Sequence, residues 1–132
     1  MKPYLLENEE LKELSTKIGG WRIMTNHIER EFIFSNFIEA FSFMTKIALI
    51  CEKHNHHPNW ENVYSKVIIK LSTHDLGGIT NLDQTIASEI NVALLSMSPY
   101  LVTIGVLVFM SARRNKNSLE APRSLGKTFF GL

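Results

Sequence analysis

The chain contains one long helical pattern, from about Phe37 to Lys53, that no glycine or proline interrupts. Ser35 or Asn36 can cap its start, and the ring of Pro58 disfavours helical backbone at the residue before it. One apolar stripe of this helix comprises Phe37, Ala40, Phe41, Met44, Ala48 and Cys51, and its apolar surface is extended by Phe43, Ile47 and Ile50. This surface is wider than one face of a sheet requires. It indicates either a deeply buried core helix or a surface for self-association.

Segments on both sides of this helix have the pattern of β-strands. Residues 21–24 and 28–34 flank the turn-prone Thr25-Asn26-His27, which predicts a hairpin. After the helix, residues 62–65 form a short extended piece. Residues 66–73 are rich in β-branched side chains, which favours a strand.

Two further helices are predicted. Residues 7–17 place acids early and a lysine late, and Gly19-Gly20 ends that helix. The other helix begins at Thr80-x-x-Asp83, which resembles a capping box, and continues to about Met97. We therefore predict an α+β fold in which three helices pack on one face of a four-stranded antiparallel sheet.

The composition limits the class of protein. A chain of 132 residues with 45% hydrophobic and 20% charged residues is typical of one soluble globular domain. The net charge of +1 provides no strong field for nucleic acid, so direct nucleic-acid binding is not expected. Cys51 alone excludes an internal disulfide and a cysteine-rich zinc site. With an acidic N-terminal segment that does not resemble a signal peptide, the expected location is the cytoplasm, with the nucleus as a further location.

The groups that titrate near neutral pH are concentrated in one stretch. From Glu52 to Tyr64 the chain reads Glu-Lys-His-Asn-His-His-Pro-Asn-Trp-Glu-Asn-Val-Tyr, and His74 follows ten residues later. An imidazole has an unperturbed pKa of about 6.5, so a cluster of imidazoles can both donate and accept protons. These residue types are those of a general acid/base site.

The order of residues in this stretch resembles the signature of the pterin-4a-carbinolamine dehydratases. The matching positions are Glu52-Lys53-x-x-x-His56-His57-Pro58-x-Trp60-x-Asn62-Val63-Tyr64-x-Lys66-Val67, then Leu71-Ser72-Thr73-His74, Gly78 and Asp83. The resemblance covers roughly residues 5–98 and also includes Gly19-Gly20-Trp21. Because its elements are numerous and ordered, it is stronger than any single short motif.

The resemblance implies a substrate and a division of roles. Members dehydrate 4a-hydroxytetrahydropterin, the product of aromatic amino acid hydroxylases, to quinonoid dihydropterin. They use no metal and no organic cofactor, so we expect neither here. Carried onto this sequence, the catalytic residues are His56, His57 and His74, with His56 binding the pterin and the other two dividing the acid and base roles. Alternation along the preceding strand places His74 on the side away from the main core. Leu82 departs from the family pattern, because many relatives carry arginine there.

Five further residues are expected at the substrate site: Glu52, Pro58, Trp60, Tyr64 and Asp83. Glu52 is placed to orient a histidine by a hydrogen bond, and Pro58 to fix the path of the loop. Trp60 and Tyr64 can line a flat pocket for the pterin, although an aromatic residue beside a strand is more often part of the core. Asp83 also has a structural role open to it, as the third residue of a helix.

Two other functional classes are open. His54, His56, His57 and His74 suggest a metal site, since imidazole is a common zinc ligand. Adjacent histidines before a proline do not, however, form the i, i+4 pair of a helical zinc motif. The second alternative is a protein-binding module, because some family members act as dimerisation cofactors of a transcription factor. The resemblance also implies a homodimer or homotetramer formed through the Phe37–Lys53 helix.

The sequence after about Ser98 lies outside the resemblance. We therefore expect a domain at residues 1–98 and an extension at 99–132. Residues 100–110 carry no charge, which permits a packed strand or helix, a membrane-seeking segment or an unusual translated end. Association with a membrane is not expected from this length, but residues 100–110 leave it open. Residues 111–132 have the composition of a poorly ordered tail.

Overall fold

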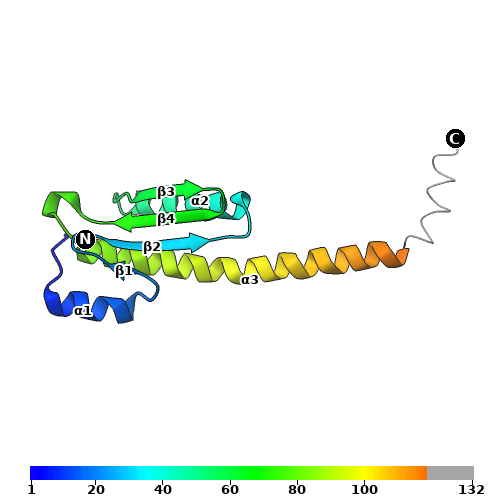
Figure 1. Ribbon diagram of the computed structural model, residues 1–132, viewed down its shortest axis with the longest axis horizontal. Helices are drawn as coiled ribbons and strands as arrows, with labels where there is room; N and C mark the ends of the chain where they lie inside the picture. Colours follow the sequence, from blue (N-terminus) through cyan, green and yellow to red (C-terminus); the bar gives the residue numbers. More distant parts are fainter. Residues whose placement is uncertain (119–132) are drawn as a thin grey trace. The chain divides into compact units, whose positions relative to one another are not determined.

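The computed structural model describes the backbone of residues 1–118 and the side chains of residues 1–97 and 106–115. Four strands form one antiparallel sheet in the order β1-β2-β4-β3, with α2 behind it in the view of Figure 1. The strands are β1 (Arg22–Ile23), β2 (Ile28–Ile33), β3 (Asn59–Val63) and β4 (Lys66–Leu71). The two central strands pair along their whole length, from Ile28 opposite Leu71 to Ile33 opposite Lys66.

Within residues 1–118, three α-helices and one short 3-10 turn accompany the sheet, which confirms the predicted α+β class. They are α1 (Asn8–Lys17), α2 (Phe37–Lys53), the 3-10 turn η1 (His74–Leu76) and α3 (Asn81–Ser118). The bounds of α2 are those that the sequence predicts. The side chain of Asn36 accepts a hydrogen bond from the backbone N–H of Glu39 at 2.9 Å, which caps the free donors at the start of α2.

One face of the sheet carries the core. Alternate residues of β4, namely Val67, Ile69 and Leu71, are fully buried, whereas the intervening Ile68 and Lys70 are partly exposed. The helices contribute fully buried side chains to the same core: Leu14 from α1, Phe43 and Ile47 from α2, and Ile86 and Ile90 from α3. This pattern is the one expected when helices cover a single face of an antiparallel sheet.

The buried side of α2 differs from the predicted stripe. Ala40, Phe43, Ile47 and Cys51 are buried, whereas Phe37 and Phe41 are 46% and 54% exposed. The part of the stripe at Phe37 and Phe41 therefore does not pack on the sheet, and of the two readings open from the sequence, its exposure fits a surface for self-association. Apolar residues occupy so much of the circumference of α2 that helical periodicity fits more than one stripe, and only the packing on the sheet selects one.

β3 begins earlier than predicted. It runs from Asn59 to Val63, and the piece expected as extended at residues 62–65 is the end of β3 and its turn into β4. Tyr64 has a positive φ of 52°, and the amide of Asn62 donates hydrogen bonds to the carbonyls of Tyr64 and Lys66. The Asn62 side chain thus supports a tight hairpin turn.

The N-terminal residues are joined to the start of α3. Leu5 forms a β-bridge with Thr80, and the N–H of Leu6 donates to the carbonyl of Ile79 at 3.0 Å. The Asn81 side-chain oxygen accepts from the N–H of Tyr4 at 2.8 Å, and the Asn81 N–H donates to the Tyr4 carbonyl. These bonds fix the position from which α3 begins.

Arg30 on β2 joins the turn after α1 to α3. Its Nη1 donates to the carbonyl of Gly19 at 3.2 Å and to the side-chain oxygen of Asn91 at 2.7 Å, and the same oxygen accepts from the indole N–H of Trp21. Burial lowers the pKa of the Arg30 guanidinium. Gly20 has a φ of +90°, and a Cβ there would lie 2.6 Å from Cζ of Arg30, so a larger residue would strain the backbone and displace the Arg30 guanidinium.

The chain divides into two compact units, Met1–Leu95 and Ser96–Leu132. The helix expected to end near Met97 continues to Ser118, and it thus includes residues 111–118 of the segment expected to be poorly ordered. Residues 119–132 lie outside the described part. Between Pro99 and Ser118 the sequence has one glycine and no second proline, so little in it breaks a helix. In the part of the chain that the structure describes, no helix is long and apolar enough to cross a membrane.

Candidate active site

The loop after α2 presents two adjacent histidines. His54 caps α2, and Asn55 follows with a positive φ of 49°, a conformation that asparagine tolerates better than most residues. The chain then turns back, and the N–H of His56 donates to the carbonyl of Cys51 at 3.0 Å. His56 and His57 therefore leave the helix end in a defined loop, which Pro58 joins to β3.

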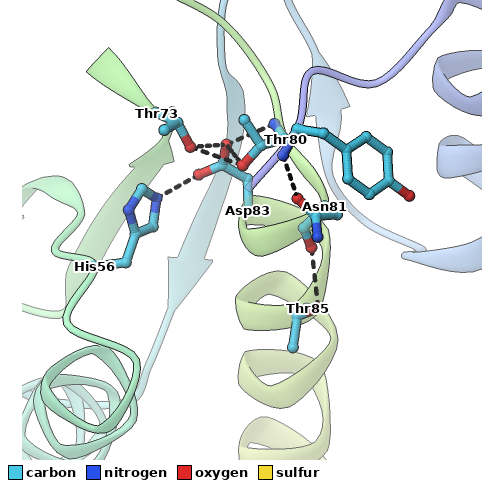
Figure 2. A network of polar contacts seen from close by, with 7 residues as sticks. His56, Thr73, Thr80, Asn81, Asp83 and Thr85 are labelled. Carbon is cyan, nitrogen blue, oxygen red and sulfur yellow. Dashed lines mark hydrogen bonds and ion pairs between the residues drawn. The ribbon is translucent and has the colours of Figure 1, made fainter. Parts of the chain in front are cut away.

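His56 is held by a buried carboxylate. Its Nε2 lies 2.6 Å from Oδ1 of Asp83, which has no exposed surface, while the His56 side chain is 12% exposed (Figure 2). Because a carboxylate accepts hydrogen bonds, the bond places a proton on Nε2 of His56 and leaves Nδ1 for another partner. A carboxylate behind an imidazole fixes both the orientation and the tautomer of the ring.

Two threonines complete the surroundings of Asp83. Its Oδ2 accepts hydrogen bonds from Oγ1 of Thr73 at 3.0 Å, from the N–H of Thr80 at 2.9 Å and from Oγ1 of Thr80 at 3.3 Å. Figure 2 shows the four side chains converging from the His56 loop, the segment after β4 and the first turn of α3. The sequence predicted a capping box at Thr80-x-x-Asp83, and the bond from the Thr80 N–H to Asp83 is one of its two hydrogen bonds. Direct contact between Asp83 and a substrate, as also predicted, does not fit a side chain with no exposed surface.

The same network fixes the segment that carries His74. Thr73 is buried, and its backbone pairs with Gly78, which closes a small loop around η1. Gly77 ends η1 with a positive φ of 73°, and its N–H donates to the carbonyls of Thr73 and His74. His74 is exposed at the first position of η1, adjacent in the chain to Thr73. Asp83 thus bonds both to His56, which precedes His57, and to Thr73, which precedes His74.

His57 has its own carboxylate partner. Its Nε2 lies 2.8 Å from Oε2 of Glu52, the second-last residue of α2. Both side chains are open to solvent, with 60% of His57 and 77% of Glu52 exposed. The arrangement is the one that the sequence predicted for Glu52 as the residue that orients a histidine, and it leaves His57 accessible to a ligand.

The remaining predicted residues lie along β3. Pro58 is half-buried between His57 and the start of β3, and Trp60 is half-buried on the helix-covered side, opposite Ile69 of β4. Tyr64 is 65% exposed in the turn at the other end of β3. At about 3.3 Å per residue, that turn is roughly 20 Å along the strand from Pro58, so one copy of the chain does not bring Tyr64 to the histidines.

Several contacts of this region were not predicted. From the sequence, Thr73 had no expected role and His54 was only a possible metal ligand. In the structure, Nε2 of His54 lies 3.0 Å from Oε1 of Glu89 on α3. Cys51 is buried beneath the loop, and burial, followed by the negative charge of Glu89, raises the pKa of its thiol to about 11. Among the residues described, no group of three or more histidine, cysteine, aspartate or glutamate side chains is arranged to hold a metal ion.

Together, the fold and the site define a class: a small α+β protein with two adjacent histidines, each hydrogen-bonded to its own carboxylate. Residues 4–93 match the family described as pterin 4 alpha carbinolamine dehydratase, and the chain belongs to this family. A curated protein of Prochlorococcus marinus subsp. pastoris, which carries a provisional pterin-4-alpha-carbinolamine dehydratase name, is 96% identical over 91 residues. A similarly named protein of Prochlorococcus marinus strain MIT 9313 is 44% identical over the same length. Each match covers 69% of this chain and 95% of the relative.

A solved structure has the same fold. The crystal structure of a transcriptional coactivator/pterin dehydratase from Brucella melitensis is similar with a TM-score of 0.66 and 37% sequence identity. The similarity covers 68% of this chain and 98% of that one. The suspected family is therefore confirmed, and the matches leave about a third of this chain outside them.

Proposed function

We propose that this protein is a hydro-lyase that dehydrates 4a-hydroxytetrahydropterin to quinonoid dihydropterin. In this reaction the bond between C4a and the hydroxyl oxygen breaks, a ring nitrogen loses its proton, and a carbon–nitrogen double bond forms. The leaving hydroxyl receives a proton and departs as water. One general acid and one general base suffice for this chemistry, and the substrate needs no metal or organic cofactor for it.

The observation that best supports this proposal is the pairing of each adjacent histidine with its own carboxylate, in a chain that belongs to this family. His56, bound to Asp83 at 2.6 Å, is suited to bind and orient the pterin because its ring is fixed. His57 and His74 are exposed and are suited to move protons. We assign the acid and base roles to these two as a pair. Pro58 and Trp60, half-buried beside the loop, are suited to shape the substrate site.

The test follows the disappearance of freshly generated 4a-hydroxytetrahydropterin with purified protein, with and without EDTA. His57→Ala and His74→Ala should each lose about 100- to 10,000-fold in rate, as expected for general acid/base residues. His27→Ala is the matched control, because His27 lies in the β1–β2 turn and should leave the rate unchanged. Wild-type rates in both single variants would refute the assignment. Loss of all activity in EDTA would favour metal chemistry instead.

A second proposal concerns self-association. The outer side of α2 exposes large apolar side chains that the core does not use: Phe37, Ile38, Phe41 and Leu49, which are 46%, 76%, 54% and 69% exposed. We propose that two or four copies of the chain associate through this side of α2. Such an interface could also serve a protein partner, since the solved relative from Brucella melitensis is described as a transcriptional coactivator as well as a dehydratase.

These functions are separable by experiment. Phe41→Asp should dissociate the oligomer in analytical ultracentrifugation, whereas His57→Ala should not. A His57→Ala/His74→Ala variant that lacks activity but still forms a stable complex with another protein would favour the binding function. An unchanged sedimentation coefficient in Phe41→Asp would overturn association through α2.

A further inference from the structure

The end of α3 has apolar side chains on all sides. Val106, Leu107, Val108, Phe109 and Met110 are consecutive and are 51% to 67% exposed. Successive residues of an α-helix are separated by about 100°, so five in a row surround the whole helix axis. A helix packed against one protein surface needs an apolar stripe on one side only. This segment therefore requires an apolar environment that surrounds it.

The charges next to this segment all have one sign. Arg113, Arg114 and Lys116 follow the apolar residues within two turns of helix, and the side chains of Arg113 and Arg114 are exposed. No acidic residue occurs between Glu89 and Glu120. The net charge of the whole chain is only +1, so the positive charge here is local rather than general. Such a cluster complements a negatively charged surface.

From these two observations we propose that residues 106–116 anchor the protein to the surface of a lipid bilayer with anionic headgroups. The apolar residues enter the acyl region, which surrounds them on every side, and the basic residues remain at the phosphate groups. Residues 106–112 span roughly 10 Å of helix, about a third of the ~30 Å hydrocarbon layer. The segment thus dips into one leaflet, in agreement with the finding that no described helix can cross a membrane.

This proposal is independent of the dehydratase reaction. The anchor lies in the unit Ser96–Leu132, whereas the residues proposed for catalysis lie in the unit Met1–Leu95. Failure of the lipid experiment would therefore leave the enzymatic proposal untouched, and the reverse holds as well.

The experiment is flotation of the full-length protein with vesicles of phosphatidylcholine alone and of phosphatidylcholine with a quarter phosphatidylglycerol. We expect binding to the anionic vesicles, and at least about tenfold weaker binding to the neutral ones, because each basic residue near the surface adds attraction. Val108→Asp/Phe109→Asp should abolish flotation, and Arg113→Gln/Arg114→Gln should reduce it by about tenfold or more. Val63→Asp, at an apolar side chain that is 68% exposed on β3, is the matched control and should float like the wild type.

Three outcomes would overturn the proposal. The first is a wild-type protein that does not float with anionic vesicles. The second is equal flotation of the wild type and Val108→Asp/Phe109→Asp, because binding would then be by charge alone. The third combines two results: the wild type does not bind vesicles, and in sedimentation without lipid it self-associates while Val108→Asp/Phe109→Asp does not. This segment would then bind a second copy of the chain. Circular dichroism of each variant checks that it is folded.

Discussion

Asp83→Asn tests whether the buried carboxylate organises the site. The substitution keeps the size of the side chain but replaces one acceptor oxygen by an NH2 donor. If the new NH2 takes the place of Oδ2, it faces the N–H of Thr80, which in the wild type donates to Oδ2 at 2.9 Å. At the Oδ1 position it would face Nε2 of His56, now at 2.6 Å. The first orientation sets the new NH2 against the N–H of Thr80, so that two donors face each other. The second requires His56 to change tautomer, so that its Nε2 can accept.

The expected cost follows from burial. Asp83 is fully buried, so water cannot replace a lost partner. One buried donor without an acceptor costs about 1–3 kcal/mol, and a hydrogen bond to a charged group contributes about 1.5–3 kcal/mol. We expect Asp83→Asn to lower the free energy of unfolding by about 2–3 kcal/mol. Asp83→Ala should cost about 3–5 kcal/mol, since it removes the common partner of several buried groups.

Urea unfolding followed by circular dichroism measures this change. Asp75→Asn is the matched control, because Asp75 is an exposed aspartate in η1 and should leave the midpoint unchanged. A double-mutant cycle with His56→Ala should give a coupling energy of at least about 1 kcal/mol, since the two side chains share a short hydrogen bond. Equal stability of Asp83→Asn and the wild type, or zero coupling to His56, would refute the reasoning. If the amide NH2 of Asp83→Asn faces His56, the His56 ring nitrogens in NMR spectra should also show a changed tautomer.

Three further predictions concern other parts of the fold. Gly20→Ala should lower the free energy of unfolding by about 1–3 kcal/mol, because a φ of +90° strains alanine and the new Cβ would push the Arg30 guanidinium away from its hydrogen bonds to Gly19 and Asn91. Gly19→Ala, with nothing within 4 Å of the new Cβ, should lower it by less, and equal losses in urea unfolding would contradict this. Asn36→Ala should cost about 1 kcal/mol by removing the cap of α2, and an unchanged melting temperature would show that the cap contributes nothing. Burial raises the pKa of the Cys51 thiol to about 11 in the folded protein, whereas the thiol of the unfolded chain ionises near pH 9. The contribution of this group to the free energy of unfolding is therefore fully present below about pH 9 and is lost as the pH rises through 11. Cys51→Ala should remove that part of the pH dependence, and at pH 8 the native thiol should react with iodoacetamide at least about 100-fold more slowly than in urea; comparable rates would mean that the thiol is accessible.

Features set by neighbouring residues were predictable from the sequence. The ends of α2 follow from the cap at Asn36 and from Pro58, and the bond between Thr80 and Asp83 follows from a spacing of three residues. The segment of β3 at residues 59–61 was missed because asparagine and glutamate have low strand propensity, and pairing with β4 overrides that propensity.

Contacts between distant parts of the chain were not predictable in the same way. His56 and Asp83 are 27 residues apart, and Thr73 and Asp83 are ten apart, so no local pattern connects them. The resemblance to the family placed His56 and Asp83 in one site but did not show that one is buried behind the other. The sequence also could not select which side of α2 faces the sheet, because both sides are apolar.

The bonds between the N-terminal residues and the start of α3 bear on how the protein should be handled. Leu5 and Leu6 pair with Thr80 and Ile79, only three to four residues before Asp83. Removal of the first six residues would therefore release the first turn of α3, and a bulky affinity tag fused directly to Met1 would crowd it. A protease that removes these residues would weaken the hydrogen bond between Asp83 and His56 without cutting near any histidine. For biochemical work, a tag belongs behind a flexible spacer, and intact mass should be checked before any rate is compared.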